Sequence, residues 1–346
     1  MKNFFIVLIA GLIIYGCGGQ KKEEKPVESQ NKFNFDTTDI KAVPVANQNQ
    51  LYFLRYKLQK SKTYNFRITA ISKDEQTISN KDTTMSQTME QTMIYNMGFD
   101  VTDIDADSTM EMKTTINSIK VDGSAGTQKI HYQSGLTKDT AEIHKYAEYE
   151  SLVRNPFNIR ISKLGDLLDI YRVEGIVNKL LKIRGYADSL KSEEKTTLKN
   201  DITESVLKPL LSQVFRKMPD NKVSKDTTWK IAQPATSLMV FQVENTSIFT
   251  ITGIENLNGD IIADIQGGLK TKISGKNTLN QQGVNYEFTK PETSGGGKIY
   301  FNITKGLLQK TKTSSSVKIG VSMESRGQKG NKKEVITNTN IVEYLQ

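Results

Sequence analysis

The side chains best suited to acid–base chemistry near neutral pH are the two histidines, His131 and His144. A serine–histidine–carboxylate triad needs a nucleophile on a sharp turn, and the Gly-x-Ser-x-Gly pattern that builds one does not occur. Two histidines thirteen residues apart without further ligands also make a poor zinc site. We therefore expect no catalytic residue, metal or cofactor, and both histidines at surface or packing positions. A hydrolase, the remaining enzymatic alternative, needs either histidine within hydrogen-bond reach of Ser, Asp or Glu in a cleft.

Three alternating carboxylates, Asp103, Asp105 and Asp107, resemble the start of a calcium-binding loop. Such a loop requires glycine at its sixth position and glutamate at its twelfth, but Ser108 and Thr114 stand there. The spacing therefore favours an acidic turn of a hairpin.

The glycine-rich stretch from Ser294 to Lys298 superficially resembles a phosphate-binding loop. It lacks the first glycine at the required spacing, a hydroxyl after Lys298 and a following helix. We interpret it as a flexible linker within a loop at residues 291–297.

Four methionines share one parity and form the candidate ligand-facing set: Met85, Met89, Met93 and Met97. Spacing by four also suits a helix, but threonine at many intervening positions favours a strand, because β-branched residues fit the pleat. Flexible thioethers suit irregular or lipid-like ligands. The alternative is plain core packing of these side chains beneath helices.

The N-terminus predicts export and lipid attachment. A short basic head precedes an apolar run from Phe4 to Tyr15, which is too short to span a bilayer permanently. The residues from Ile14 to Cys17 resemble a lipobox, which implies cleavage after residue 16 and acylation of Cys17. Several acyl chains give stable membrane attachment. An ordinary secretory signal with an incidental cysteine is the alternative.

The composition limits the remaining functions. Cys17 is the only cysteine, which excludes an intramolecular disulfide and a site built from several thiolates. A formal net charge of +9 often points to nucleic acid, but the interleaved aromatic residues of single-strand readers are missing. We expect no nucleic-acid partner. The charge forms either a solvated surface or one attracted to anionic lipids or polysaccharides.

The order of elements follows from composition and periodicity. Residues 17–50 are polar and predict a flexible tether. Alternating apolar and polar residues predict an N-terminal β half at 51–172 that opens with a strand at 51–58, and a C-terminal β half at 220–346. Apolar residues at helical spacing predict a two-helix insert at 173–219, kinked or restarted at Pro209. We expect this insert to cover one face of a sheet.

Two segments resemble each other, at residues 99–123 and 249–275. In both, phenylalanine, threonine and isoleucine precede a polar turn, a second strand and a closing glycine. Each therefore predicts a β-hairpin. Either the two arose by duplication, which implies a pseudo-symmetric pair of curved sheets, or two ordinary hairpins converged.

Local motifs taken together resemble an uncharacterised lipoprotein family of Bacteroidota, domain of unknown function 6263. The resemblance covers most of residues 51–345 and brings no known activity or catalytic residue. Departures from it are Ser61 and Lys225, where glycine is usual, and Asn302, near an expected aspartate. The strand–turn–strand at 298–310 is also similar to the half-barrel lipoprotein carriers of the periplasm. The motif residues are Leu54, Arg55, Tyr56, Lys57, Leu58, Lys60 and Tyr64, the run Phe157–Leu168, then Met218, Pro219, Val223, Asp226 and Trp229, and finally Gly297–Phe301, Lys305, Gly306 and Leu308.

The sequence therefore predicts a mainly β protein (α+β) with antiparallel curved sheets, which could be a pseudo-duplicated half-barrel pair, and a two-helix insert. We expect a non-enzymatic cell-envelope lipoprotein, lipid-anchored to the outer membrane and facing the periplasm or the exterior. Its concave apolar sheet would bind a lipid-like or other hydrophobic ligand. The alternative is a structural lipoprotein that binds another envelope protein and has no ligand cavity.

Overall fold

The computed structural model describes residues 33–136, 139–187, 189–325 and 327–346. The predicted signal at 1–16, Cys17 and the tether up to residue 32 lie outside the described residues. No helix among the described residues is long and apolar enough to cross a membrane.

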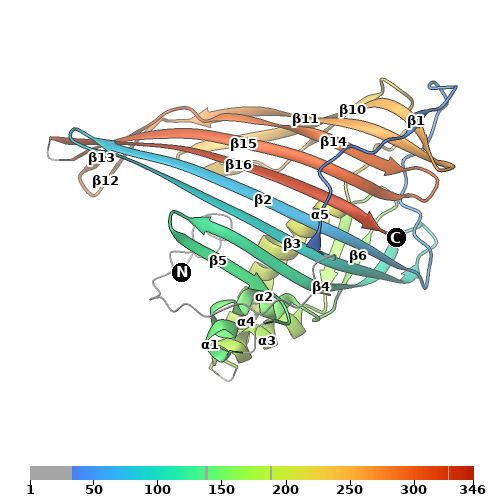
Figure 1. The fold of residues 1–346 in the computed structure, drawn as a ribbon, viewed down its shortest axis with the longest axis horizontal. Helices are drawn as coiled ribbons and strands as arrows, with labels where there is room; N and C mark the ends of the chain where they lie inside the picture. The colour runs from blue at the N-terminus through green and yellow to red at the C-terminus, as the bar shows by residue number, and fades with distance from the viewer. Residues whose placement is uncertain (1–32, 137–138, 188, 326) are drawn as a thin grey trace.

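The strands form a single large sheet (Figure 1). Its path is β1-β10-β11-β14-β15-β16-β2-β3-β4-β6-β7, and all neighbours pair antiparallel. The strands are β1 Val43–Pro44, β2 Thr63–Asn80, β3 Thr84–Ile104, β4 Met110–Ala125, β5 Gln128–Gln133, β6 Phe157–Ile161, β7 Leu167–Tyr171, β8 Thr228–Ala232, β9 Thr236–Leu238, β10 Phe241–Leu257, β11 Asp260–Gly275, β12 Thr278–Gln281, β13 Val284–Phe288, β14 Glu292–Asn302, β15 Leu307–Ser325 and β16 Gln328–Leu345.

The predicted antiparallel β class is confirmed, and the two β halves form one sheet instead of two. Strand β16, at the C-terminal end of the chain, pairs with β2 on one side and β15 on the other, so it joins the halves. The two similar segments are both hairpins as predicted, one from β3 and β4 and the other from β10 and β11. They lie in the same sheet, separated by β14, β15, β16 and β2.

The sheet has a concave face that carries the core and a convex face. Side chains directly opposite in the register point to the same face, so Phe66, Met97 and Ile116 share the concave side. These side chains are buried beneath the helical segments. Figure 1 shows the helices gathered on this one side, while the long hairpins extend beyond them toward β12 and β13.

The helical insert lies where the sequence predicts it. Helix α3 spans Glu174–Arg184, α4 spans Ser192–Ile202, and a π-helical turn at Thr203–Leu207 leads directly into α5 at Lys208–Val214. The π turn just before Pro209 has a physical cause, because proline lacks an amide hydrogen and its ring crowds the preceding turn. Two further short helices, α1 Thr140–Lys145 and α2 Ala147–Leu152, precede β6.

The predicted first strand at 51–58 is not a strand. Its alternation is real, because Leu54, Tyr56 and Leu58 are buried while Lys57 is exposed. The segment 52–58, named the strap here, runs extended but finds only scattered backbone partners in distant loops. Tyr52 pairs with Val223 in an isolated bridge, the Tyr56 amide donates to Lys163 O, and the Lys57 amide donates to Gly306 O.

Residues 33–50, which the sequence assigns to the flexible tether, lie on the sheet. Phe33 is only 6% exposed, and Asp36 pairs with Lys310 of the convex face at 2.7 Å. Val43–Pro44 then forms strand β1 against the edge of β10. In Figure 1 this blue segment crosses the sheet on the side opposite the helices. A few apolar and acidic residues therefore hold this mainly polar segment against the sheet.

Candidate functional site

The four methionines do not form one surface. Met85 is 73% exposed, Met89 is half-buried, and Met93 is partly buried against the core. Met97 is 1% exposed inside the core, where the alternative interpretation places it. The strand assignment and the shared parity hold, but β3 runs from the solvent-exposed end of the sheet to the part beneath the helices. Neighbouring methionines of one face therefore meet different environments.

The two histidines lie outside the linings of both large pockets of the described residues. His131 Nδ1 lies 2.6 Å from Asp122 Oδ1 at an exposed site, and His144 is exposed on α1. Among the described residues no group of three His, Cys, Asp or Glu could hold a metal ion.

The three turn carboxylates point to separate partners, as an acidic hairpin turn implies. Asp103 pairs with Lys60 at 2.6 Å and Asp105 pairs with Arg160 at 2.6 Å. Asp107 accepts a hydrogen bond from the amide of Thr109 at 2.9 Å.

The glycine-rich segment is a strand in the middle of the sheet, so its interpretation as a flexible linker is wrong. Ser294 to Gly297 belong to β14, which pairs with β11 on one side and β15 on the other. Glycine is needed at these positions because neighbouring atoms leave no room for a side chain. A Cβ on Gly296 would lie 3.0 Å from Gly267 O, and a Cβ on Gly295 would lie 3.2 Å from Leu269. Backbone pairing on both sides outweighs the poor strand propensity of glycine.

These glycines hollow the concave face. One register row across the sheet reads Phe249, Gly267, Gly297, Thr313 and Asn340. A large aromatic ring at one end and small or absent side chains beyond it leave a cleft of about 460 Å³, named the concave cleft here. This volume lies within the range of about 300–1,000 Å³ typical of small-ligand pockets.

The lining of the concave cleft is apolar with a polar margin. Phe249, Leu269, Ile299 and Val317 supply apolar surface. Phe249 is held by stacking on Trp229, with ring centroids 5.4 Å apart. Hydroxyl and amide side chains on the same face surround this surface, from residues Gln233, Thr236, Asn245, Ser247, Thr293, Thr313, Ser315 and Asn340. An apolar wall with a hydrogen-bonding rim suits an amphipathic ligand.

Arg216, which also lines the cleft, is positioned by the strap. The Tyr56 hydroxyl accepts a hydrogen bond from the Arg216 amide at 2.9 Å and lies 3.2 Å from Val214 O and 3.3 Å from Arg216 O. It therefore fixes the backbone just after α5. Burial raises the pKa of Tyr56 above its usual value, so the hydroxyl stays protonated as a donor.

The motif residues on which the family resemblance rests converge around the strap. Gly165 and Gly306 both have positive φ, and each leaves room for the strap. A Cβ on Gly165 would lie 2.5 Å from Tyr56 Cε2, and one on Gly306 would lie 2.5 Å from Lys57 Cβ. Arg55 donates to Pro219 O at 2.6 Å, and the Tyr56 ring packs edge-on against Phe301. These motifs therefore build the framework beside the concave cleft.

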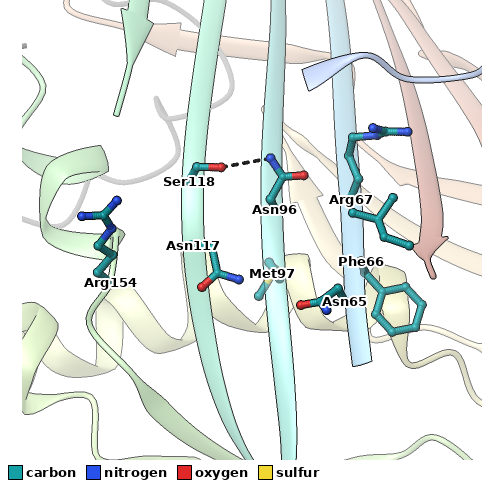
Figure 2. Close-up of a pocket in the computed structure, with 9 residues that line it drawn as sticks. Asn65, Phe66, Arg67, Asn96, Met97, Asn117, Ser118 and Arg154 are labelled. Atoms are coloured by element: carbon teal, nitrogen blue, oxygen red, sulfur yellow. Dashed lines mark hydrogen bonds between the residues drawn. The ribbon is translucent and has the colours of Figure 1, made fainter. Parts of the chain in front are cut away.

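A second pocket of about 670 Å³, named the convex pocket here, opens on β2, β3 and β4. Figure 2 shows its polar lining, in which Asn96 Nδ2 donates to Ser118 Oγ at 3.0 Å. Asn96 Oδ1 is buried without a hydrogen-bond partner among the described residues. Arg67 is held by Glu343 at 2.9 Å, and Glu343 also accepts from the amide of Asp36. The remaining lining residues are Asn65, Phe66, Met97, Asn117, Arg154 and Leu345.

Sequence reasoning predicted neither pocket. Met97 borders the convex pocket, but its side chain is packed in the core on the other face of the sheet. A signal for the concave cleft existed. Glycines at 267–268 and 295–297 interrupt two stretches that otherwise read as strands, and glycine within a strand often marks a close approach of another backbone or a ligand. The register that places these glycines side by side depends on long-range pairing.

Likeness to solved structures is weak. A structure titled lipid-protein interactions in lipovitellin matches with a TM-score of 0.39 and 9% identity over 84% of this chain. The chain spans only 26% of that lipovitellin chain. OccK2 (OpdF) of Pseudomonas aeruginosa matches at 0.21 with 5% identity, over 82% of this chain and 98% of that one. OpdQ of the same organism matches with a TM-score of 0.19 and 5% identity, over 81% of this chain and 98% of that one. Scores this low carry no argument about fold or function.

No curated protein matches the sequence of this chain. One family model does match, over residues 107–308, which is more than half of the chain. The matched region runs from the β3–β4 turn through the helical insert to the start of β15. The chain belongs to the family of unknown function DUF6263.

Proposed function

We propose that this chain is a non-enzymatic envelope lipoprotein that binds a hydrophobic or amphipathic ligand in the concave cleft. The observation that carries the ligand proposal is the glycine-floored hollow of about 460 Å³, walled by Phe249, Leu269, Ile299 and Val317. The methionines have no part in this proposal, because Met97 is core and Met85 is exposed.

The envelope part of the proposal rests on the N-terminal sequence. Export through residues 1–16, acylation of Cys17 and attachment to the outer membrane of a Bacteroidota cell are its elements, with the body in the periplasm or at the cell surface. A Cys17→Ser variant is expected to leave the membrane fraction, whereas recovery of that variant in the membrane would count against the anchor.

Ligand binding is tested on the full chain carrying Cys17→Ser, which keeps every described residue and removes the proposed anchor. Fatty acids of increasing length are titrated against it. Each methylene that enters the apolar cleft contributes about 0.8 kcal/mol, or about a fourfold gain in affinity. We expect affinity to rise with chain length and then level off once the cleft is filled. Mass spectrometry of protein extracted gently from its native membrane is expected to detect a co-purifying lipid.

A pair of variants locates the binding. Ser315 faces the concave cleft, and Ser315→Trp places a large ring in it. Thr337 lies on the neighbouring strand β16 with its side chain on the convex face, so Thr337→Trp is the matched control. Ser315→Trp is expected to weaken fatty-acid binding at least tenfold and the control less than twofold. Absence of binding to the unmodified cleft would instead favour the alternative, a structural or partner-binding lipoprotein.

A further inference from the structure

Arg216 is the only charged residue among the described residues that line the concave cleft. The rest of the lining consists of apolar, glycine, hydroxyl and amide groups. Because the described part of the lining contains no carboxylate, the charge of the guanidinium has no counter-ion within it.

The Arg216 side chain is partly buried and lacks a carboxylate partner in the cleft. Its Nε is buried without a hydrogen-bond partner among the described residues, and burial lowers its pKa because the charged form is desolvated. Two other partly buried arginines are paired with carboxylates. Arg67 lies 2.9 Å from Glu343, and Arg184 lies 2.6 Å from Glu148. An unpaired buried charge costs stability unless something else compensates for it.

We propose that the ligand of the concave cleft carries an anionic head group, a carboxylate or a phosphate, that pairs with Arg216 while its apolar part lies along Phe249, Leu269 and Val317. This inference rests on the proposed ligand-binding function. The guanidinium is a planar donor array that matches carboxylate and phosphate oxygens in a bidentate manner. Such a pair is strengthened where water is partly excluded.

Neighbouring groups support recognition of a head group with several oxygens. Gln233 lies at the cleft, with its Nε2 2.9 Å from Ser247 Oγ. Thr313, Ser315 and Asn340 lie on the concave face of β15 and β16, next to the glycines of β14. These groups can donate hydrogen bonds to oxygens that Arg216 does not reach. Tyr56 is the positioning residue, because its hydroxyl holds the Arg216 backbone.

The test compares ligands that differ only in head-group charge. An undecanoic acid with a dansyl label and its neutral methyl amide are titrated by fluorescence against the full chain carrying Cys17→Ser. Dodecyl phosphate and dodecanol form a second matched pair, read by displacement of the label. Acetate and inorganic phosphate, also read by displacement, show whether the anion alone suffices. We expect each anionic amphiphile to bind at least tenfold more tightly than its neutral partner and the free anions to compete only weakly.

Variants assign the preference to Arg216. Arg216→Gln is expected to reduce the charge preference to less than twofold, while Arg216→Lys keeps part of it. The control is Lys217→Gln, whose lysine is exposed and pairs with Asp166 at 2.7 Å, and it should keep the full preference. Circular dichroism confirms folding of each variant, and Arg216→Lys remains informative if Arg216→Gln does not fold.

The outcomes separate this inference from the proposed function. If acid and amide bind equally well to the chain with Arg216 intact, the inference is overturned and the ligand-binding function stands. The inference is also overturned if the Arg216→Gln variant prefers anionic over neutral ligands as strongly as the chain with Arg216 does. If neither ligand of either pair binds, the proposed function fails, and the inference fails with it.

Discussion

Ser61 departs from the motif and lies in the turn before strand β2. It stands where related motifs carry glycine and adopts a left-handed backbone with φ of 63°. Its amide still donates to Val101 O at 2.8 Å. The sequence identified the departure, and the structure shows that the serine accepts the strained conformation.

Ser61→Gly is expected to raise the free energy of unfolding by about 0.5–1 kcal/mol. The left-handed conformation costs an L-residue about 1–2 kcal/mol, and the extra freedom of glycine in the unfolded chain returns part of that gain. Urea unfolding measures the difference. Ser86→Gly, the same change inside strand β3, should instead lower stability, and a loss from Ser61→Gly would contradict the strain argument.

We expect Arg216 to lower the stability of the fold while it favours the binding of anionic ligands. Arg216→Met removes a desolvated charge without a carboxylate partner in the cleft, so the free energy of unfolding should rise by about 1 kcal/mol. The same variant should lose the preference for anionic ligands. Thermal unfolding and ligand titration of one preparation measure both effects, and a marked loss of stability would show that Arg216 has a structural role instead.

Among elements, the strap and the glycine-rich strand β14 explain where sequence reasoning failed. Periodicity located the helical insert at 173–219 because its apolar residues are spaced for a helix, and a helix needs only local hydrogen bonds. The strap carries the alternation of a strand, but its backbone partners belong to separate loops at Lys163, Val223 and Gly306. Strand β14 has poor local propensity and is formed by its two neighbours.

Gly306→Ala tests the contact between the strap and the β14–β15 turn. The new Cβ would lie 2.5 Å from Lys57 Cβ and 2.6 Å from Lys57 N, and Gly306 has φ of 64°. We expect a loss of about 3 kcal/mol or more, because backbone would have to move in addition to the φ strain.

Gly283→Ala is the control for that variant. Gly283 has φ of 78° and no atom within 4 Å of an added Cβ, so only the conformational cost of about 1–2 kcal/mol applies. Urea unfolding measures both variants. Equal losses of unfolding free energy would mean that the strap can move to accommodate the new Cβ at little cost.

At the scale of the whole molecule, buried tyrosines predict sensitivity to alkaline conditions. Burial raises the pKa of Tyr56 and Tyr95 well above their usual value of 10.0, and it raises the pKa of Tyr149 to about 12. The folded state therefore keeps protons that the unfolded chain loses near pH 10. Stability is intact below that pH and falls as the pH rises from 10 through 12. Unfolding free energies at pH 8, 10 and 11.5 measure the decline, and Tyr149→Phe should make it shallower.

Periodicity gave the β class and hairpin units of the whole molecule but not their assembly into one sheet. Joining the halves requires β16 to pair with β2, more than 250 residues away in sequence, as in the pair Thr339 and Ile71. Nothing in either strand specifies its partner, because both alternate in a similar way. The concave cleft depends on this same long-range assembly and was therefore not predictable from local pattern.

The attachment of residues 33–44 to the convex face has a consequence for access to the concave cleft. Asp36 and Asp39 pair with Lys310 and Lys298, whose side chains point away from the cleft. If Cys17 carries lipid, the anchored segment joins the body of the protein on the convex face. At most about 55 Å of extended chain separates the lipid from Phe33. Because residues 33–44 lie on the convex face, they leave the mouth of the cleft uncovered. A ligand would therefore enter the cleft without displacing the segment that leads to the anchor.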